Sequence, residues 1–471
     1  MKPMCNVLDI LSKIEWKLNE PVLDVMNYVW AIGGGIGGIP KRYNERVITP
    51  EMIKDAAFRE KLKLLKEHQH NRETHGLRCE WVLRMNIANS FKSCRKIYFP
   101  HNCDFRGRVY PIPPHLNHMG PDINRGMLNF SEGKPIGKEG LWWLKVHLSN
   151  KWGQDKLPLN ERAKYAESMM EDVHRMAEDP KNNLDWLKAD NPWQALGAIF
   201  ELSAALNSPV PEEYISHIHV HVDGSCNGMQ HYAAFGRDEN GGKQVNLADG
   251  DRPGDVYTAI LKLVIQDIEK EQDPELIPIA ESLKGKISRK VIKQTVMTSV
   301  YGVTFIGARQ QIQRQLKDRK LYDTNGELYR ASNYLARRTI KCIGDLFSDA
   351  NQIKDWFAKC ARIVAATGEP VKWRSPLGLP CVQPYKYISK STVVNTIIQS
   401  LNVAKNLDEQ PVNKAKNTTA FPPNFVHSID STHMMLTALE CEKEGITFAA
   451  VHDSYWTHPS DITRMNAILR Q

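Results

Sequence analysis

The stretch HIHVHVDGSC, from His217 to Cys226, alternates apolar and polar residues and then breaks at a glycine. Alternation with a period of two is typical of a β-strand with one buried face. Ile218, Val220 and Val222 lie on one face of this strand, and the histidines lie on the other face with Asp223. The sequence therefore predicts a short strand that ends at an exposed aspartate.

The residues of this strand leave three interpretations open. The strand can be half-solvated, with its histidines facing water, which is common for a polar face. The spacing of His219, His221 and Asp223 also matches the H-x-H-x-D of some zinc-dependent hydrolases, although Gly224 stands where their next histidine is expected. In the third interpretation Asp223 alone is a ligand of Mg²⁺, a hard cation that prefers oxygen.

A second aspartate lies near the other end of the chain. The segment ITFAAVHDSYWTH, residues 446–458, predicts a hairpin with Asp453 at its tip. By itself, a His-Asp pair at a hairpin tip is typical of a surface turn. Asp453 gains interest because other charged residues of the chain fit the same chemistry.

Those charged residues lie in RKVIKQTVMTSVYG, within a predicted helix over residues 286–301. Arg289 and Lys293 are four residues apart, and Tyr301 and Gly302 follow. Residues four apart drift little around a helix, so the first three side chains form one slanting stripe. Two cations on such a stripe can hold a triphosphate, with the tyrosine beside the sugar and the base. The alternative is a solvated basic face.

Five segments together resemble the single-subunit, phage-like RNA polymerase family. They are most similar to its mitochondrial branch, with plastid members near. Three resemble motifs A, B and C of that family, and two resemble its D-x-x-G-R and histidine-bearing segments. DGSCNGMQHY (223–232), RKVIKQTVMTSVYG (289–302) and VHDSYW (451–456) resemble motifs A, B and C. HNCDFRGRVYPIPPHLNHMG (101–120) resembles the D-x-x-G-R segment, and FPPNFVHSIDSTHMM (421–435) resembles the histidine-bearing segment. The resemblance covers the chain from about residue 101 with all motifs in their family order, so it is specific.

The resemblance implies nucleotidyl transfer by a two-metal mechanism. In such a mechanism one metal ion lowers the pKa of the RNA 3′-hydroxyl, and both ions stabilise the in-line transition state. By resemblance, Asp223 and Asp453 hold two Mg²⁺ ions with help from the Gly224 carbonyl. Arg289 and Lys293 would neutralise the incoming triphosphate, and Lys293 would also protonate the pyrophosphate leaving group.

The same resemblance implies residues for the sugar and for the template. Tyr301 and His427 would together sense the ribose 2′-hydroxyl. Asp104, Gly107 and Arg108 would support the template, and the glycine would allow a close approach of the backbone.

A further hairpin is predicted around SPLGLP, residues 375–380, because this turn joins two β-like runs. Beyond it, residues 385–402 predict a long extension that carries Lys386 and Lys390. Members of the family insert a specificity loop into the promoter at this place. The extension is therefore expected to reach DNA.

The implied fold is α+β, of the right-hand polymerase type, predominantly helical with a small antiparallel palm sheet. Residues 1–95 would form an N-terminal remnant and thumb-like helices, with the glycine-rich segment 31–40 as a linker between them. Residues 96–250 and 428–471 would form a discontinuous palm, and residues 251–427 would form the fingers.

Composition sets broad limits on the protein. Its 471 residues are too many for one hydrophobic core, and 42% hydrophobic with 25% charged residues is ordinary for a globular protein. The net charge of +8 (62 basic minus 54 acidic residues) permits a phosphate-rich partner. Nine cysteines without a C-x-x-C pair argue for a reducing compartment and against a zinc knuckle.

By resemblance, the expected activity is DNA-directed RNA synthesis by a monomer in the mitochondrial matrix, with no membrane association. The expected partners are a DNA template and promoter, the RNA product, NTPs and mitochondrial initiation factors. One alternative is an inactive nucleic-acid-binding fragment, because relatives continue well beyond the position of Gln471 and carry a long N-terminal extension. Family A DNA polymerases share R-x3-K-x7-Y-G, but their motif C ends in His-Asp-Glu, where this chain has Ser454.

Overall fold

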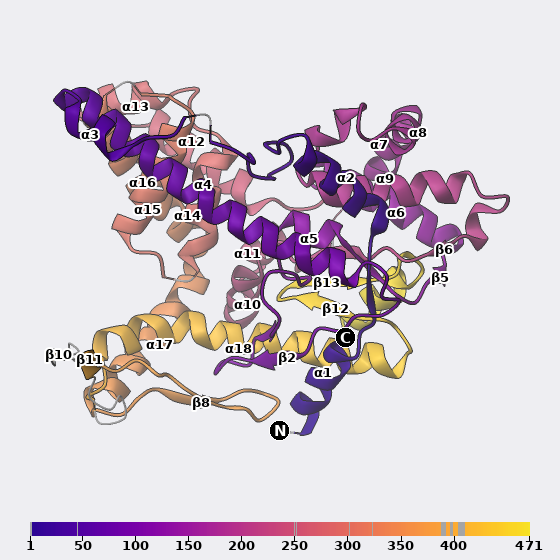
Figure 1. Ribbon diagram of the computed structural model, residues 1–471. Helices are drawn as coiled ribbons and strands as arrows, with labels where there is room; N and C mark the ends of the chain where they lie inside the picture. The colour runs from indigo at the N-terminus through magenta and orange to yellow at the C-terminus, as the bar shows by residue number, and fades with distance from the viewer. Residues whose placement is uncertain are drawn as a thin grey trace. The chain divides into compact units, whose positions relative to one another are not determined.

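The computed structural model describes residues 2–44, 46–248, 250, 252–300, 302–322, 324–387, 392–395, 399–403 and 410–471, and for 392–395 and 401–403 the backbone alone. The described chain is mainly helical, and its small sheets are antiparallel wherever a register is described (Figure 1). This confirms the predicted α+β class. The chain divides into two compact units. Unit 1 comprises Cys103–Arg108 and Gly224–Met434, and unit 2 comprises Lys2–Asn102, Val109–Asp223 and Met435–Gln471.

Unit 2 combines most of the described strands with a set of helices from both ends of the chain. Its helices are α1 (Lys2–Ser12), α2 (Glu20–Ala31), α3 (Pro50–Asp55), α4 (Phe58–Phe91), α5 (Asp122–Gly126), α6 (Gly137–Trp152), α7 (Leu159–Ser168), α8 (Met170–Glu178), α9 (Pro192–Leu206) and α19 (Ile462–Ile468), with the short helices η1 (Leu184–Lys188), η2 (Pro211–Glu213) and η4 (Pro459–Asp461). Its strands are β1 (Trp16–Leu18), β3 (Val109–Pro111), β4 (Leu128–Phe130), β5 (Lys134–Pro135), β6 (Ile215–Ser216), β7 (Val220–Asp223), β12 (Ala449–Val451) and β13 (Ser454–Thr457); β2 (His101–Cys103) ends at the unit boundary.

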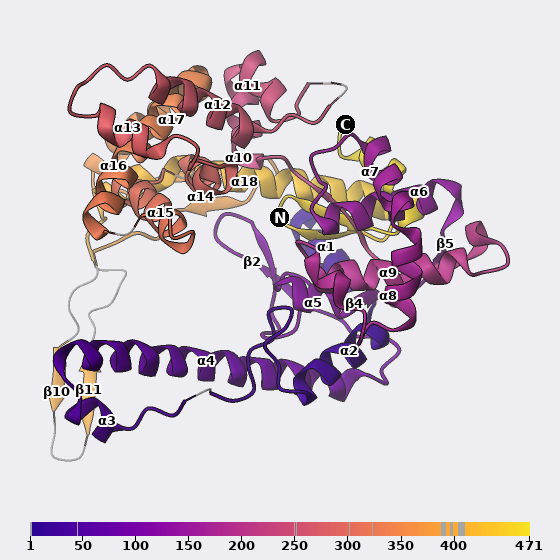
Figure 2. The ribbon, with the colours of Figure 1, turned by 90° about the horizontal axis from the view of Figure 1, so that it is seen from above.

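The centre of unit 2 is a three-stranded sheet in the order β12-β13-β7. Trp16, Phe130 and Trp456 are fully buried beside it. Helix α9 packs against α6 and α8 (Figure 2). Its sequence PWQALGAIFELSAAL is apolar almost all round, which is typical of a helix buried on every side. Its Pro192 occupies the first helical turn, where no backbone donor is needed.

Unit 1 is a helical body that carries two hairpins. Its helices are α10 (Asn227–Gly236), α11 (Glu239–Gln244), α12 (Val256–Glu269), α13 (Ile277–Leu283), α14 (Arg289–Ser299), α15 (Phe305–Asp318), α16 (Asn325–Leu346), α17 (Ser348–Ala366) and most of α18 (Lys414–Lys443). Its strands are β8 (Lys372–Arg374), β9 (Pro380–Val382), β10 (Thr392–Asn395) and β11 (Ser400–Val403).

The core of unit 1 follows from the amphipathic faces of its helices. Helix α14 buries Val291, Ile292 and Val296, which recur at helical spacing, and leaves its cations on the other face. Helix α16 begins at the N-cap Thr324, whose hydroxyl accepts a hydrogen bond from the Glu327 backbone (3.2 Å) and donates one to the Glu327 carboxylate (2.9 Å).

Several predicted elements are present with shorter bounds. The predicted helix over 286–301 is α14, and the hairpins predicted at 446–458 and around 375–380 are β12–β13 and β8–β9. The predicted glycine linker is a turn-rich segment after α2, in which Gly33 and Gly34 adopt positive φ. The names thumb, palm and fingers stay a prediction. Within the described residues, no helix combines the length and the apolar character needed to cross a membrane.

Candidate active site

The two predicted metal-binding aspartates lie on neighbouring strands of unit 2. Strand β7 pairs with β13, and the register places Asp223 opposite Ser454. Asp453 directly precedes Ser454 at the tip of the β12–β13 hairpin. Residues opposite each other in an antiparallel pair have Cα atoms about 4.5–5.5 Å apart, so the backbones of the two aspartates are neighbours. Asp223 is exposed and Asp453 is half-buried.

The hairpin tip is held in an uncommon conformation. Val451 pairs with Ser454, which leaves a two-residue turn of His452 and Asp453. His452 has φ 58°, in the left-handed region that costs a non-glycine residue about 1–2 kcal/mol. The Tyr110 ring packs edge-on against His452, with centroids 5.1 Å apart. Strained backbone of this kind clusters at functional sites.

Two cations of unit 2 act on Asp223 electrostatically. Burial lowers the pKa of Lys151 to about 8, and the negative charge of Asp223 opposes this shift. Burial also lowers the pKa of Arg125, again opposed by Asp223. The Arg125 guanidinium lies over the Trp456 ring, 5.4 Å from its centroid. The negative charge of Asp223 thus stabilises the charged forms of Lys151 and Arg125.

His219 and His221 are buried and His217 is half-buried, so the prediction that these histidines face water is wrong for His219 and His221. His219 and His221 are only 3% and 5% exposed, because the Trp456 ring stacks on both. An ammonium can only donate, so Lys151 donates to His221 Nδ1 (2.8 Å). His221 Nε2 then donates to His219 Nδ1 (2.7 Å), and His219 Nε2 donates to the Leu128 carbonyl (2.9 Å). The result is a hydrogen-bonded chain with one direction.

These hydrogen bonds argue against the interpretation of His219 and His221 as zinc ligands. Every ring nitrogen of His219 and His221 has a hydrogen-bond partner in the protein, so a zinc ion could bind only if one of these hydrogen bonds broke. No group of three or more histidine, cysteine or carboxylate side chains suited to a metal occurs in the part of the chain that the structure describes. The hydrogen bonds of His219 and His221 therefore argue against the zinc interpretation, and oxygen ligation by Asp223 stays a prediction.

The predicted triphosphate-binding cations lie together in unit 1, at the start of α14. Arg289 donates to both carboxylate oxygens of Asp255, at 2.8 and 3.3 Å. The charged groups of Arg289 and Lys293 lie over the same ring, that of Tyr257, at 5.0 and 5.9 Å from its centroid. The predicted stripe is therefore present for these two residues. Tyr301, its third member, lies outside the described residues.

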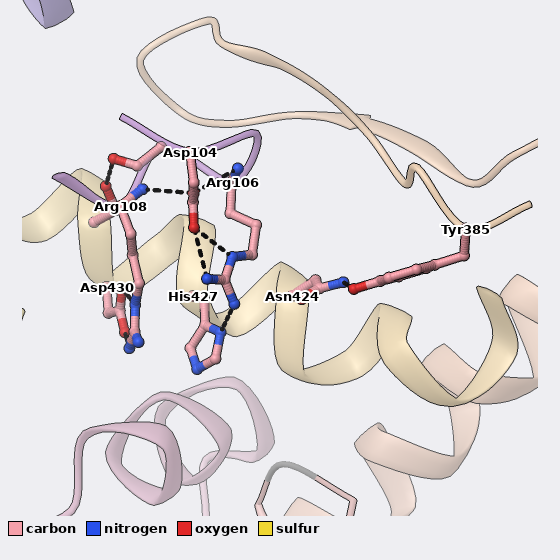
Figure 3. Close-up of polar contacts among 9 residues, drawn as sticks. Asp104, Arg106, Arg108, Tyr385, Asn424, His427 and Asp430 are labelled. Carbon is pink, nitrogen blue, oxygen red and sulfur yellow. Dashed lines mark hydrogen bonds and ion pairs between the residues drawn. The ribbon is translucent and has the colours of Figure 1, made fainter. Parts of the chain in front are cut away.

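The segment Asp104–Arg108 folds into a turn organised by Asp104 (Figure 3). Asp104 Oδ1 accepts hydrogen bonds from the backbone of Arg106 (2.9 Å) and of Arg108 (3.1 Å). Asp104 Oδ2 accepts from Arg106 Nε (2.9 Å) and Nη2 (2.6 Å). The remaining terminal nitrogen of Arg106, Nη1, lies 2.6 Å from Nδ1 of His427 on α18.

The same turn is fastened to α18 a second time. Arg108 pairs through two nitrogens with Asp430, and the Gly107 carbonyl accepts from the Ser431 hydroxyl. Burial raises the pKa of Asp430, and the Arg108 guanidinium opposes this shift. Gly107 has φ 95°, which strongly favours glycine. The structure thus brings together the predicted sugar residue His427 and the predicted template residues Asp104, Gly107 and Arg108.

The predicted site residues are divided between the units. Asp223 and Asp453 belong to unit 2, and Gly224 begins the main segment of unit 1. The other described ones belong to unit 1: Asp104, Gly107, Arg108, Arg289, Lys293 and His427.

Sequence reasoning missed four partners of these residues: Arg106, Asp430, Asp255 and Lys151. Two of them left a signal in the sequence. Asp430 follows His427 by three residues on one helix, which places both on one face. Asp255 directly precedes the apolar periodicity of α12, where a capping residue is expected, and its side chain accepts from the Tyr257 backbone (3.2 Å).

Comparisons with known proteins identify the relatives of this chain. A family model described as DNA-dependent RNA polymerase matches residues 134–471. DNA-directed RNA polymerase 1, mitochondrial, of Arabidopsis thaliana is 45% identical over 100% of this chain and 49% of its own length. DNA-directed RNA polymerase 2B, chloroplastic/mitochondrial, of Nicotiana tabacum is 44% identical over 100% of this chain and 47% of its own length.

The chain spans about half the length of these curated relatives. Among solved structures, the POL domain of Pol1 from M. smegmatis, in complex with DNA primer-template and dNTP, has 12% identity and a TM-score of 0.47. It covers 99% of this chain and 65% of its own.

Proposed function

The chain belongs to the DNA-dependent RNA polymerase family, and on that premise we propose that it forms the catalytic region of a single-subunit organellar RNA polymerase. The proposed reaction joins NTPs to an RNA 3′ end under the direction of a DNA template. The observation that carries this proposal is the pairing of β7 with β13, which makes Asp223 and Asp453 neighbours.

Asp223 and Asp453 fit a magnesium site by the chemistry of their donors. Both offer carboxylate oxygens, and the Gly224 carbonyl would add a neutral oxygen, which suits a hard cation. Bound there, two Mg²⁺ ions would supply Lewis-acid activation and charge neutralisation during nucleotidyl transfer. Lys151 and Arg125 lie within electrostatic range of the Asp223 carboxylate.

Arg289 and Lys293 would bind the triphosphate of the incoming NTP. Their positions over one ring keep the two charges close together, and Arg289 sits at the N-terminus of α14, which itself favours an anion. Lys293 would then donate a proton to the pyrophosphate as it leaves.

His427, with Tyr301, would sense the ribose 2′-hydroxyl, and the turn of Asp104, Gly107 and Arg108 would support the template. Within the right-hand fold, residues 1–95 would give thumb-like helices. Residues 96–250 and 428–471 would give the palm, and residues 251–427 the fingers. The expected setting is a mitochondrial matrix or another organelle, with promoter DNA and initiation factors as partners of a monomer.

The proposal is tested by replacing the two carboxylates in the full-length protein. Asp223→Asn and Asp453→Asn should each lower magnesium-dependent extension of an RNA primer on DNA at least a thousandfold, roughly 4 kcal/mol of transition-state stabilisation. Binding of Mn²⁺ by the 471-residue chain should weaken in parallel. Asp155→Asn is the control, because it removes an exposed carboxylate of unit 2 that pairs with Lys156.

Two outcomes would contradict the proposal. Near-normal extension by either aspartate variant would reject the two-metal assignment. If the unaltered protein binds a primer-template and never extends it, the nucleic-acid-binding alternative would replace the proposed enzyme.

A further inference from the structure

Arg106 joins the D-x-x-G-R turn to the predicted sugar-sensing histidine. Its guanidinium uses Nε and Nη2 on the Asp104 carboxylate and places Nη1 2.6 Å from His427 Nδ1 (Figure 3). Asp104 is itself fixed by the backbone of the turn, through hydrogen bonds from Arg106 and Arg108. All of these residues belong to unit 1. Arg106 therefore orients His427, and Asp104 orients Arg106.

The chemistry of the contact determines where the proton of the ring lies. A guanidinium carries five donors and no acceptor, so His427 Nδ1 can only accept from Arg106. A proton on Nδ1 would place two donors face to face at 2.6 Å. A neutral imidazole with an accepting Nδ1 carries its proton on Nε2. The contact with Arg106 thus selects one tautomer and also fixes the plane of the ring.

We propose that Arg106 is a positioning residue for ribose selection, which acts by holding His427 as the Nε2–H tautomer. This inference rests on the proposed role of His427 toward the ribose 2′-hydroxyl. In this tautomer, Nε2 offers a donor to the hydroxyl oxygen of an NTP, and a dNTP has no oxygen there. Asp104 serves the same end, because it orients the fork of Arg106. The D-x-x-G-R turn then contributes to sugar choice as well as to the template.

The neighbouring Arg108 shows why Arg106 is singled out. Arg108 directs its guanidinium to Asp430, and the two form an ion pair that fastens the turn to α18. Arg108, two residues after Arg106, therefore already provides the ion pair that attaches this turn to α18. Arg106 is half-buried, like His427. Its Nη1 contacts the imidazole ring of His427 and not a second carboxylate.

The decisive measurement is the tautomer of His427 in the 471-residue chain, by ¹⁵N NMR with histidine ring labelling. His427→Gln would assign the signal. The unaltered chain should show a protonated Nε2 and an accepting Nδ1. Arg106→Gln should lose this fixed state, and so should Arg106→Lys, because an ammonium cannot bridge Asp104 and His427 as a planar fork does. Asp104→Asn should loosen it in the same direction.

The matched control is Trp373→Phe, which removes the hydrogen bond from the indole to the Ser428 hydroxyl (2.9 Å), one residue along α18. This variant perturbs the same helical turn and leaves Arg106 in place. It should lower the melting temperature and leave the tautomer unchanged. A tautomer change in Trp373→Phe as large as that in Arg106→Gln would overturn the inference, because general loosening of α18 would then explain both.

Activity gives an independent readout in the full-length protein. Arg106→Gln should lower the ratio of kcat/KM for NTP over dNTP roughly tenfold, mostly through the NTP, as expected for one lost hydrogen bond. An unaltered His427 tautomer in Arg106→Gln overturns the inference whatever the sugar preference. A third outcome is a changed His427 tautomer in Arg106→Gln, with an unchanged kcat/KM ratio in both Arg106→Gln and His427→Gln. This outcome would overturn the proposed role of His427 and, with it, the inference about ribose selection.

Discussion

Asp255 controls the charge that α14 offers to an anion. It neutralises Arg289 through two hydrogen bonds and also caps α12, where the Thr258 hydroxyl donates to it at 2.6 Å. A triphosphate that reaches Arg289 must share the guanidinium with this carboxylate. Asp255 therefore orients Arg289 and at the same time weakens its attraction for anions.

Asp255→Asn separates these two effects, because asparagine keeps an oxygen acceptor for the cap and loses the charge. We expect pyrophosphate to bind the variant roughly fivefold more tightly at low salt, about 1 kcal/mol, since the pair is partly exposed. Titration calorimetry measures this directly. The gain should shrink as salt is added.

The control for this prediction is Asp349→Asn, which removes an exposed aspartate from the same unit. It should leave pyrophosphate binding almost unchanged. Weaker binding by Asp255→Asn than by the unaltered chain would show that orientation of Arg289 matters more than its free charge.

At the scale of elements, the hairpin beyond β9 begins with paired backbone at residues 385–387 and 411–413, which we call its neck. Asn413 donates its backbone N–H to the Tyr385 carbonyl (3.1 Å), and Tyr387 donates to the Pro411 carbonyl (2.9 Å). Lys386 and Val412 form a bridge between these two contacts. Strands β10 and β11 pair beyond the neck, and the rest of the predicted loop, including Lys390, lies outside the described residues.

This neck allows a clean deletion. Replacing residues 388–410 by a two-residue Asn-Gly turn keeps the paired residues Tyr387 and Pro411 as the ends of the hairpin. If the loop reads the promoter, initiation at a promoter should fall by at least about tenfold, while extension of a preassembled RNA–DNA hybrid stays normal. Both activities are measured on the same preparation. An equal loss of both would assign the hairpin a structural role.

The sequence predicts local elements better than their pairing. Alternation around Val220 and Val222 predicts strand β7, because this signal is local. The pairing of Asp223 with Ser454 is long-range, and only the family resemblance suggested it. The burial of His219 depended on Trp456, a residue far along the chain that covers this face. The role of Arg106 could not be predicted because its partner His427 lies on α18, far along the chain.

At the scale of the whole molecule, burial of histidines makes stability depend on pH. Unfolded histidines titrate near pH 6.5. In the fold, burial lowers the pKa of His219 to about 3 and that of His118 well below 6.5. Between these pH values the unfolded chain binds more protons, so the stability is complete above about pH 6.5 and falls as the pH decreases.

The expected loss between about pH 7 and pH 5 is roughly 2 kcal/mol per such histidine, seen as a lower urea midpoint. His219→Gln cannot titrate at this position, so its midpoint should depend less steeply on pH, by up to one proton. His68→Gln is the control, because His68 lies on the long helix α4 and keeps contact with solvent. Parallel pH profiles for the unaltered chain and His219→Gln would contradict this prediction.

The pairing of β7 with β13 also fixes an order of events during synthesis. Strand β7 leaves the ribosome before any of the long helical segment of unit 1, and its partner β13 comes only afterwards. Until then β7 is an edge without its neighbour, which is a surface prone to aggregation, and the late closure is slow. A chain released early would lack Asp453 and the tryptophan that stacks on the histidines. The order of β7 and β13 along the chain means that the two carboxylates become neighbours only after β13 has been synthesised and has paired with β7.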